Sequence, residues 1–231
     1  DDGDLRLMSM LRGQDLRHTL DTTAEAPIDP FAGPFAHIVV DEAQELTDAQ
    51  WQMLVRRNPT RSFTIVGDRA QARPGFAETW QERLRRVGLD HVEVATLTVG
   101  YRTPEEVMSV AEPVIRAALP DASVPRAIRR SGAPVRYGSA RELDDIVSTW
   151  TAEHAEGVAV VIGAPWFASR ERVRSLDPER VKGLEFDLVV LVDPDGFGAG
   201  LTGAVDRYVA MTRATAQLVI LTTEDTADTA E

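Results

Sequence analysis

Two adjacent carboxylates, Asp41 and Glu42, directly follow the short apolar run His37–Val40. The β-branched content of that run predicts a buried strand, so both acids stand where a strand ends. In α/β proteins such a carboxylate can hold Mg²⁺, directly or through water, and its neighbour can polarise an attacking water. The pair can equally be two solvated charges at a strand end. Asp41 is therefore a candidate magnesium ligand, and Glu42 is a candidate catalytic carboxylate.

A second apolar run, Phe63–Val66, ends in the same way with Gly67-Asp68, and Gln71 follows. A carboxamide such as that of Gln71 can donate to a phosphate oxygen and accept from an attacking water at the same time. A Gly-Asp turn that caps a helix has the same appearance. Polar residues after two apolar runs favour a site that collects groups from several strand ends.

Three further segments offer contacts for a base, a sugar and a phosphate. Tyr101 can stack on a purine, and Arg102 can bind a phosphate through two N–H groups. Gly183 allows close approach of the backbone, and Glu185 can accept a ribose hydroxyl. Arg213 ends an expected helix, where it can neutralise charge that develops on a terminal phosphate. Each segment also has a structural explanation: a core tyrosine beside a surface arginine, a turn entering a strand, and an arginine compensating a helix end.

The elements that must position these residues alternate along the chain. Apolar runs predict strands over residues 37–40, 63–66, 92–99, 135–137, 158–162, 186–192 and 217–221. Helical spacing and capping patterns predict helices from the capping box at 47–50, over 77–87, 103–119, 140–155 and 204–214, and loosely over 1–20. Loops are expected over 21–35, 120–134 and 193–203, and a frayed acidic tail over 222–231.

This alternation predicts an α/β fold with parallel sheets flanked by helices on both faces. Ligands of such sheets lie outside the carboxyl ends of the strands, where the polar residues stand here. The helix over 103–119 has a marked start, in which Thr103 is expected to be the cap and Pro104 the first helical residue.

Composition narrows the class of protein. The 231 residues carry 25 basic and 37 acidic side chains, a net charge of −12, which argues against binding that relies on phosphate neutralisation. The absence of cysteine excludes disulfides, thiolate catalysis and cysteine-based zinc sites. No apolar run approaches the ~18 residues of a membrane span. The first residues show no signal peptide, so we expect a cytoplasmic protein without a membrane partner. The basic residues are 24 arginines and one lysine, Lys182.

Taken together and in this order, the segments resemble the motifs of the UvrD/Rep-like superfamily 1 helicase and translocase ATPases. The matches are to the second motif, DEAQ at 41–44; the third, GDRAQ at 67–71; the fourth, GYRT at 100–103; the fifth, VKGLEFD at 181–187; and the sixth, RYVAMTRA at 207–214. The resemblance implies a RecA-like fold, with ATP and Mg²⁺ as cofactors. It divides the chain into the C-terminal part of a first motor domain, 1–96, and a complete second motor domain, 97–231.

The resemblance also assigns roles to single residues. By it, Asp41 holds Mg²⁺, Glu42 is the catalytic carboxylate and Gln71 senses the terminal phosphate. The other two catalytic residues, Arg102 and Arg213, contact that phosphate. The nucleotide-binding residues are Tyr101 on adenine, Glu185 on the ribose, and Gln44, Asp68 and Gly183 within the motifs.

Three features depart from the family pattern. The phosphate-cradling loop G-x-x-x-x-G-K-[ST] is absent, because the only lysine, Lys182, is followed by Gly183-Leu184. We therefore expect this chain, which lacks an initiator Met, to be inactive alone and to belong to a longer enzyme whose upstream part carries that loop. The segment Ser175–Arg180 stands where the fifth motif has a Thr and a His that contact nucleic acid. Only about 80 residues separate the fourth and fifth motifs, which leaves no room for the inserted subdomain of a DNA helicase.

The fuller phrases AHIVVDEAQELTDAQWQML, SFTIVGDRAQAR and KGLEFDLVVLVDP resemble the actinobacterial HelD-type ATPases, which act on RNA polymerase and clear it from nucleic acid. The leading hypothesis is a recycling motor with RNA polymerase core as its partner. The alternative is a 3′-to-5′ DNA helicase or translocase of the same superfamily, with DNA as its partner. A third hypothesis is a degenerate module that binds without hydrolysing nucleotide. The intact Glu42, Gln71, Arg102 and Arg213 argue against that third hypothesis.

Overall fold

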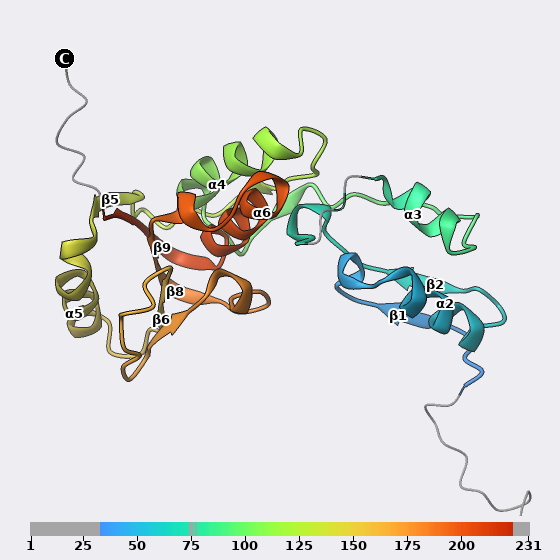
Figure 1. The fold of residues 1–231 in the computed structure, drawn as a ribbon, viewed down its shortest axis with the longest axis horizontal. Helices are drawn as coiled ribbons and strands as arrows, with labels where there is room; N and C mark the ends of the chain where they lie inside the picture. Colours follow the sequence, from blue (N-terminus) through green and yellow to red (C-terminus); the bar gives the residue numbers. More distant parts are fainter. Residues whose placement is uncertain (1–32, 74–75, 77, 224–231) are drawn as a thin grey trace, which may run out of the picture.

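The computed structural model describes residues 33–73, 76 and 78–223. The helical spacing expected over 1–20, most of the expected loop over 21–35 and the acidic tail from residue 224 lie outside the described residues. Figure 1 shows two groups of helices and strands, one at each end of the described chain.

The second region, residues 99–223, is built on a five-stranded sheet in which all neighbouring strands are parallel (Figure 1). In order across the sheet the strands are β5 (Arg136–Ser139), β9 (Ala214–Thr222), β8 (Phe186–Val192), β6 (Ala159–Ile162) and β7 (Val173–Leu176). β8 lies at the centre, since its sequence FDLVVLV can be buried on both faces. The predicted α/β class and the predicted bounds of this strand are both confirmed.

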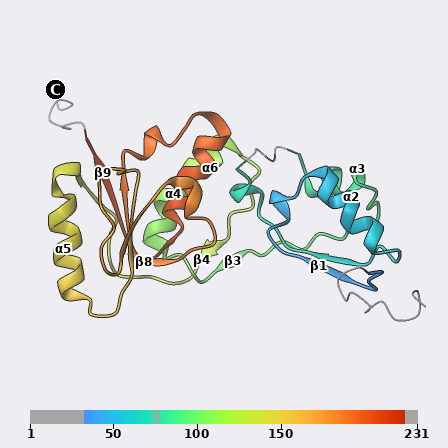
Figure 2. The same ribbon diagram turned by 60° about the horizontal axis from the view of Figure 1, so that its bottom comes forward.

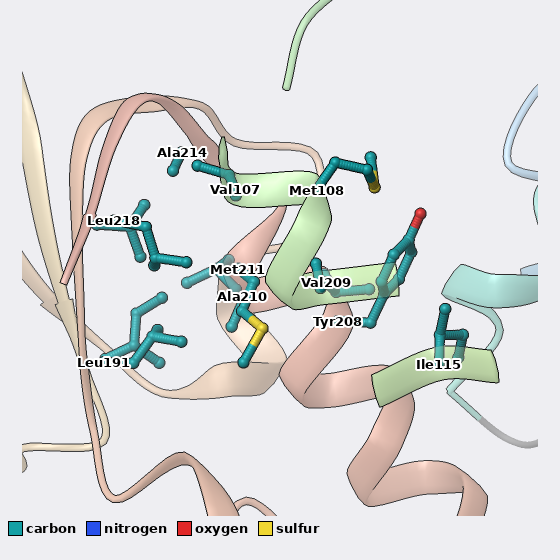
Figure 3. Close-up of a cluster of buried hydrophobic side chains, with 14 of the residues drawn as sticks. Val107, Met108, Ile115, Leu191, Tyr208, Val209, Ala210, Met211, Ala214 and Leu218 are labelled. Atoms are coloured by element: carbon teal, nitrogen blue, oxygen red, sulfur yellow. The ribbon is translucent and has the colours of Figure 1, made fainter. Parts of the chain in front are cut away.

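Helices cover both faces of this sheet, because alternate residues of each strand point to opposite sides. On one face, Val189 and Leu191 of β8 pack with α4 (Glu105–Ala118) and α6 (Gly200–Met211). On the other face, Val190 packs with α5 (Leu143–Glu153). Figure 2 shows α5 on one side of the strands and α4 and α6 on the other. Figure 3 shows the first of these clusters, in which side chains of α4 and α6 meet those of β8 and β9.

The first region, residues 33–92, is smaller. It contains a two-stranded parallel sheet of β1 (Ile38–Val40) and β2 (Phe63–Ile65), with α2 (Asp48–Arg57) and α3 (Trp80–Arg86). Both helices begin with a capping box, formed by Thr47 and Gln50 in α2, as the sequence predicts, and by Thr79 and Glu82 in α3. Trp51 of α2 is fully buried and anchors the core of this region.

Short 3-10 helices follow several of the strands. They are η1 (Ala43–Glu45), η2 (Arg69–Gln71), η3 (Ala140–Glu142), η4 (Pro178–Arg180) and η5 (Pro194–Gly196). The remaining strands, β3 (Val99–Gly100) and β4 (Arg126–Ala127), form a separate parallel pair.

Several predicted elements were wrong in extent. The run 92–99 is extended as a strand only at β3, because its partner β4 offers two residues for pairing. The segment 120–134, expected to be a loop, contains β4, and β7 was not predicted. Both missed strands carry polar residues that hide their pairing. Helix α3 begins at residue 80 rather than 77, and α6 begins at residue 200 rather than 204.

The predicted start of α4 was wrong by one residue. Pro104 is the N-cap and makes no side-chain cap. The hydroxyl of Thr103 instead donates to the carbonyl of Thr212 at 3.3 Å, and the Glu105 N–H donates to the carbonyl of Arg129 at 2.8 Å. Tertiary partners thus take the place of the local cap, and they hold the segment of Tyr101 and Arg102 against later segments of the second region, at Arg129 and Thr212.

Candidate functional site

The turn after β1 carries both candidate carboxylates. Glu42 adopts the left-handed backbone conformation (φ 51°, ψ 38°), which is uncommon for a residue with a side chain. Its amide N–H donates to Asp41 Oδ1 at 2.8 Å, and the N–H of Ala43 donates to the carbonyl of Val66 at 3.0 Å. The carboxyl ends of β1 and β2 are thereby held together.

Gln44 connects the two strand ends through its side chain. The residue is buried, its Nε2 donates to Glu42 Oε2 at 2.6 Å, and its Oε1 accepts from the Asp68 N–H at 3.0 Å. Gly67 makes room for this arrangement, because a Cβ there would lie 2.9 Å from Gln44 Oε1 and 2.6 Å from the Trp80 ring. Gln44 therefore holds the Glu42 carboxylate relative to the end of β2.

Asp68 positions Gln71 in turn. Its Oδ1 accepts from the Ala70 N–H and its Oδ2 accepts from Gln71 Nε2, both at 2.8 Å. Burial raises the pKa of the Asp68 carboxyl above its ordinary value, and the hydrogen bond from Gln71 partly opposes that shift. Because the side-chain nitrogen Nε2 of Gln71 donates to Asp68, its side-chain oxygen Oε1 is directed toward the second region.

Arg213 meets that oxygen from the second region. It is 3% exposed and lies between α6 and β9, where its Nε donates to the carbonyl of Val209 at 3.1 Å. Its Nη2 donates to Gln71 Oε1 at 3.4 Å. Burial lowers the pKa of the guanidinium, and Arg102 lowers it further, while Glu185 and Glu42 oppose the shift.

These contacts form one continuous series. We call Glu42, Gln44, Asp68, Gln71 and Arg213 the junction chain, because it starts in the first region and ends in the second. All five residues were predicted as site residues from the sequence, and the structure brings them into one hydrogen-bonded chain.

Two other predicted residues form a pair beside the junction chain. Arg102 Nε lies 2.7 Å from Glu185 Oε1, and both side chains are about half exposed. Gly183 has φ +75° and open space where a Cβ would stand, so the backbone there is accessible. Arg102 and Glu185 also act electrostatically on Arg213, which places the pair near the end of the junction chain.

Tyr101 is 71% exposed and makes no contact with the junction chain among the described interactions. The guanidinium carbon of Arg129 lies 5.8 Å from the Tyr101 ring centroid. Arg129 Nε donates to the carbonyl of Tyr101 at 3.1 Å, and its Nη2 donates to the carbonyls of Arg102, at 2.6 Å, and Thr215. Arg129, which sequence reasoning missed, therefore holds the backbone of both residues.

Sequence reasoning also missed the partners of Lys182. Its Nζ lies 2.5 Å from Glu45 Oε1, 2.9 Å from the backbone carbonyl oxygen of Gln71 and 3.4 Å from Glu42 Oε2. Glu45 follows the DEAQ segment directly, and this position next to a motif is the only sequence signal that could have identified it.

Two arginines complete the joint between the regions. Arg69 Nη1 lies 2.9 Å from Asp121 Oδ2, and Arg73 Nε donates to the two carboxylate oxygens of Asp206 at 3.0 and 3.1 Å. Arg73 also pairs with Glu179. Burial raises the pKa of the Asp206 carboxyl, and the hydrogen bond from Arg73 opposes this. No local sequence pattern links these partners.

The side chains of the candidate site can be compared with the groups that Mg²⁺ and the phosphates of ATP require. Within the described residues no group of three or more His, Cys, Asp or Glu side chains could hold a metal ion. Asp41 offers one carboxylate, which fits an ion such as Mg²⁺ that keeps most of its ligands from water and phosphate. The Lys182 ammonium lies 3.4 Å from Glu42, and Arg102 acts electrostatically on Arg213 at the end of the junction chain. These three cationic groups fit a phosphate chain.

Two clefts lie elsewhere and are lined mainly by residues of the second region. One of about 590 Å³ opens at the carboxyl ends of β6, β7 and β8, and its lining includes Asp177, Glu179, Asp193 and Asp206 together with Arg73. The other, of about 520 Å³, lies near Trp150 and His154. Neither cleft is lined by a predicted site residue, so the candidate site rests on the junction chain.

No protein-family model and no curated protein matches the chain. Among solved structures, it is similar to the arterivirus nonstructural protein 10 helicase, with 19% identity over 83% of this chain and 39% of that one, at a TM-score of 0.46. The complex of that helicase with DNA gives 21% identity over 83% and 39%, at 0.47. The PRRSV helicase gives 18% over 82% and 35%, at 0.48.

The chain thus spans about two fifths of the length of these solved structures or less. At such identity a likeness concerns the fold alone. The chain's own structure shows the mixed α/β architecture expected of a RecA-like fold, with a five-stranded parallel sheet flanked by helices. In the part of the chain that is described, no helix is long and apolar enough to cross a membrane.

Proposed function

We propose that the chain is the C-terminal motor portion of an ATP-hydrolysing, UvrD/Rep-like superfamily 1 protein, with ATP bound between the two regions. The observation that carries the proposal is the junction chain. It connects a carboxylate at one strand end to a buried arginine of the other region through groups that can bind phosphate and orient water. A merely structural joint has no need to place a carboxylate, a carboxamide and three cations together.

In this proposal each residue has a defined task. Glu42 orients and polarises the attacking water, and Gln71 contacts both that water and the terminal phosphate. Arg213 and Arg102 neutralise the charge that develops on the phosphate. Asp41 is the residue that would hold Mg²⁺, whose charge would stabilise the phosphate oxygens when it is bound.

The remaining proposed residues bind or position the nucleotide. Tyr101 stacks on the adenine and Glu185 accepts from the ribose, while Gly183 leaves space for the nucleotide to approach. Gln44 and Asp68 hold Glu42 and Gln71 in place, as their hydrogen bonds indicate. The phosphate-cradling loop is supplied by an upstream part of the same protein.

For the partner we propose RNA polymerase rather than DNA. Four carboxylates line the cleft at the carboxyl ends of β6, β7 and β8, and two of them, Asp177 and Glu179, belong to the segment that replaces the family's nucleic-acid contact. A phosphate backbone would be repelled there, and the net charge of −12 acts in the same direction. A protein surface with basic residues suits this cleft better.

ATP turnover by the protein that contains this chain and the upstream loop tests the proposal. We expect strong stimulation by RNA polymerase core and little by single-stranded DNA, with Glu42→Gln abolishing turnover and Glu93→Gln, an exposed control, leaving it unchanged. Stimulation by DNA alone would favour a DNA translocase. Absence of turnover in every mixture would favour a binding module. The 231-residue chain alone is expected to be inactive, and turnover near about one per second would contradict this.

A further inference from the structure

Lys182 is the single lysine of the chain, and its ammonium group reaches out of its own region. The partners that the structure gives it all belong to the first region: Glu45, Glu42 and the carbonyl of Gln71. Val181, the residue before it, is fully buried, which fixes the base of the side chain. The ammonium therefore contacts two members of the junction chain, Glu42 and Gln71, which are the residues proposed to handle the attacking water.

The hold of the two glutamates on Lys182 is loose. The side chain of Lys182 is 24% exposed, and those of Glu42 and Glu45 are 54% and 41% exposed. Such ion pairs contribute little to stability, because both partners are well solvated when apart. A terminal phosphate carries more charge on a single group and offers three acceptor oxygens. A phosphate that enters between the regions can therefore compete for the ammonium.

We propose that Lys182 is a phosphate-binding residue of the nucleotide site, held in reserve by Glu45 and Glu42 until a terminal phosphate enters. This inference rests on the proposed function and identifies a group that the motif assignment left without a role. Before transfer, Glu42 Oε2 accepts from Gln44 and faces the ammonium. When the ammonium of Lys182 binds the phosphate instead, its ion pair with Glu42 is lost, and the Glu42 carboxylate becomes available to the attacking water.

The single lysine makes a direct test simple. A chain grown with lysine labelled with ¹³C and ¹⁵N in its side chain gives one side-chain ammonium signal in the NMR spectrum, and this signal belongs to Lys182. We expect Glu45→Gln to move the signal in the absence of nucleotide. We expect the magnesium complex of a non-hydrolysable ATP analogue to move it further, with saturation, and the magnesium complex of ADP to move it less.

Affinity measurements by calorimetry supply a readout that a purely structural lysine would not affect. Lys182→Ala should weaken binding of the ATP analogue by about tenfold, the scale of one charge-assisted contact, and binding of ADP by much less. Glu45→Gln should strengthen binding of the analogue by about threefold, because it releases the ammonium. Arg180→Ala, which removes an exposed positive charge two residues away, should change neither affinity.

The outcomes separate this inference from the proposed function. If the analogue binds while the Lys182 signal stays in place, or if Glu45→Gln weakens binding, the role of Lys182 is wrong and the nucleotide site stands. If neither nucleotide binds to the chain at millimolar concentration, the inference about Lys182 fails, whereas the proposed function, in which an upstream loop supplies the main phosphate cradle, is decided by turnover of the longer protein. The amide spectrum of each variant shows whether the chain is still folded.

Discussion

The two regions of the molecule bury their sheets to very different degrees. In the second region, six of the seven residues of β8 are buried, and helices cover both faces. In the first region, Val39 of β1 is 68% exposed, and Val66, just after β2, is 50% exposed. A two-stranded sheet with a partly open face is marginally stable in water. The second region can therefore stand on its own core, while the first region depends on contacts outside its own sheet.

The 3-10 helix η2 supplies much of that contact. Ala70 is 1% exposed and packs in the cluster formed by α4, α6 and the sheet of the second region. Its neighbours Arg69 and Gln71 contact Asp121 and Arg213. The segment that carries the predicted phosphate sensor is thus also the joint between the regions. Any change that separates the regions should therefore affect the candidate site as well.

The largest expected loss of stability follows a cavity in the second region. Leu191 of β8 is fully buried among side chains of α4 and α6 (Figure 3). Leu191→Ala should lower the free energy of unfolding by about 3 kcal/mol, because the surrounding side chains cannot close the cavity. Urea unfolding followed by circular dichroism measures this.

Trp51→Ala is the matched change in the first region, since Trp51 is also fully buried. We expect hydrogen exchange to lose protection in α2 and α3 while the amides of β8 keep theirs. An equal loss of protection in β8 would show that the two regions unfold as one unit.

A charge placed in the joint should have the next largest effect. Ala70→Glu puts a carboxylate into an apolar cluster without a partner. We expect a cost of about 2 kcal/mol, limited because the regions can separate and let the charge reach water. Small-angle X-ray scattering should then show a larger radius of gyration. Ala49→Glu on the exposed face of α2 introduces the same charge and should leave the radius unchanged.

The elements predicted best from the sequence are those whose structure depends on their own residues rather than on distant partners. The strand over 186–192 has the predicted bounds, because a continuous apolar run must be covered on both faces. The capping box at Thr47 and Gln50 is confirmed because all its partners are local. The strands β4 and β7 were missed, since residues such as Arg126 and Arg174 gave no apolar pattern and the strands depend on distant partners.

The contacts of the candidate site also fall into those that the sequence predicted and those that it did not indicate. The order of the motifs predicted that Glu42, Gln71 and Arg213 come together, and the structure shows the contacts that join them. The pairing of Lys182 with Glu45 joins residues 137 positions apart, and no periodicity or spacing reports such a contact. The role of Arg129 is equally invisible in the sequence, because its partners are backbone carbonyls, which every residue has.

Arg129→Ala tests whether contacts with backbone carbonyls hold the strand pair β3–β4 at the edge of the second region. The change removes the donors that hold the carbonyls of Tyr101, Arg102 and Thr215. We expect the amide of Ile128, which donates to Gly100, to exchange with solvent about tenfold faster, a local loss of about 1.4 kcal/mol. Global stability should change less than this.

The control for that variant is Arg126→Ala, which removes an exposed arginine of β4, three residues before Arg129. It should leave the exchange of Ile128 near its original rate. Equal acceleration in both variants would mean that the positive charge, rather than the carbonyl contacts, holds the strand pair.

The smallest expected effect tests how the first region responds to pH. Arg86 donates to both carboxylate oxygens of Glu78, and Arg83 donates to one of them. The hydrogen bond from Arg86 lowers the pKa of the Glu78 carboxyl below its ordinary value of 4.5, with a smaller contribution from Arg83. The pair therefore stabilises the fold above pH 4.5, and this contribution is lost as the pH falls through the lowered pKa.

Glu78→Gln should accordingly cost less than about 1 kcal/mol at pH 7, since the pair is partly exposed and screened by solvent. The difference from the original protein should vanish at a pH below the lowered pKa. Urea unfolding at a series of pH values, with Glu93→Gln as a control of equal charge in the segment after α3, measures it. A difference that persists in acid would mean that Glu78 stabilises the first region by packing, and that its ion pairs with Arg83 and Arg86 contribute nothing.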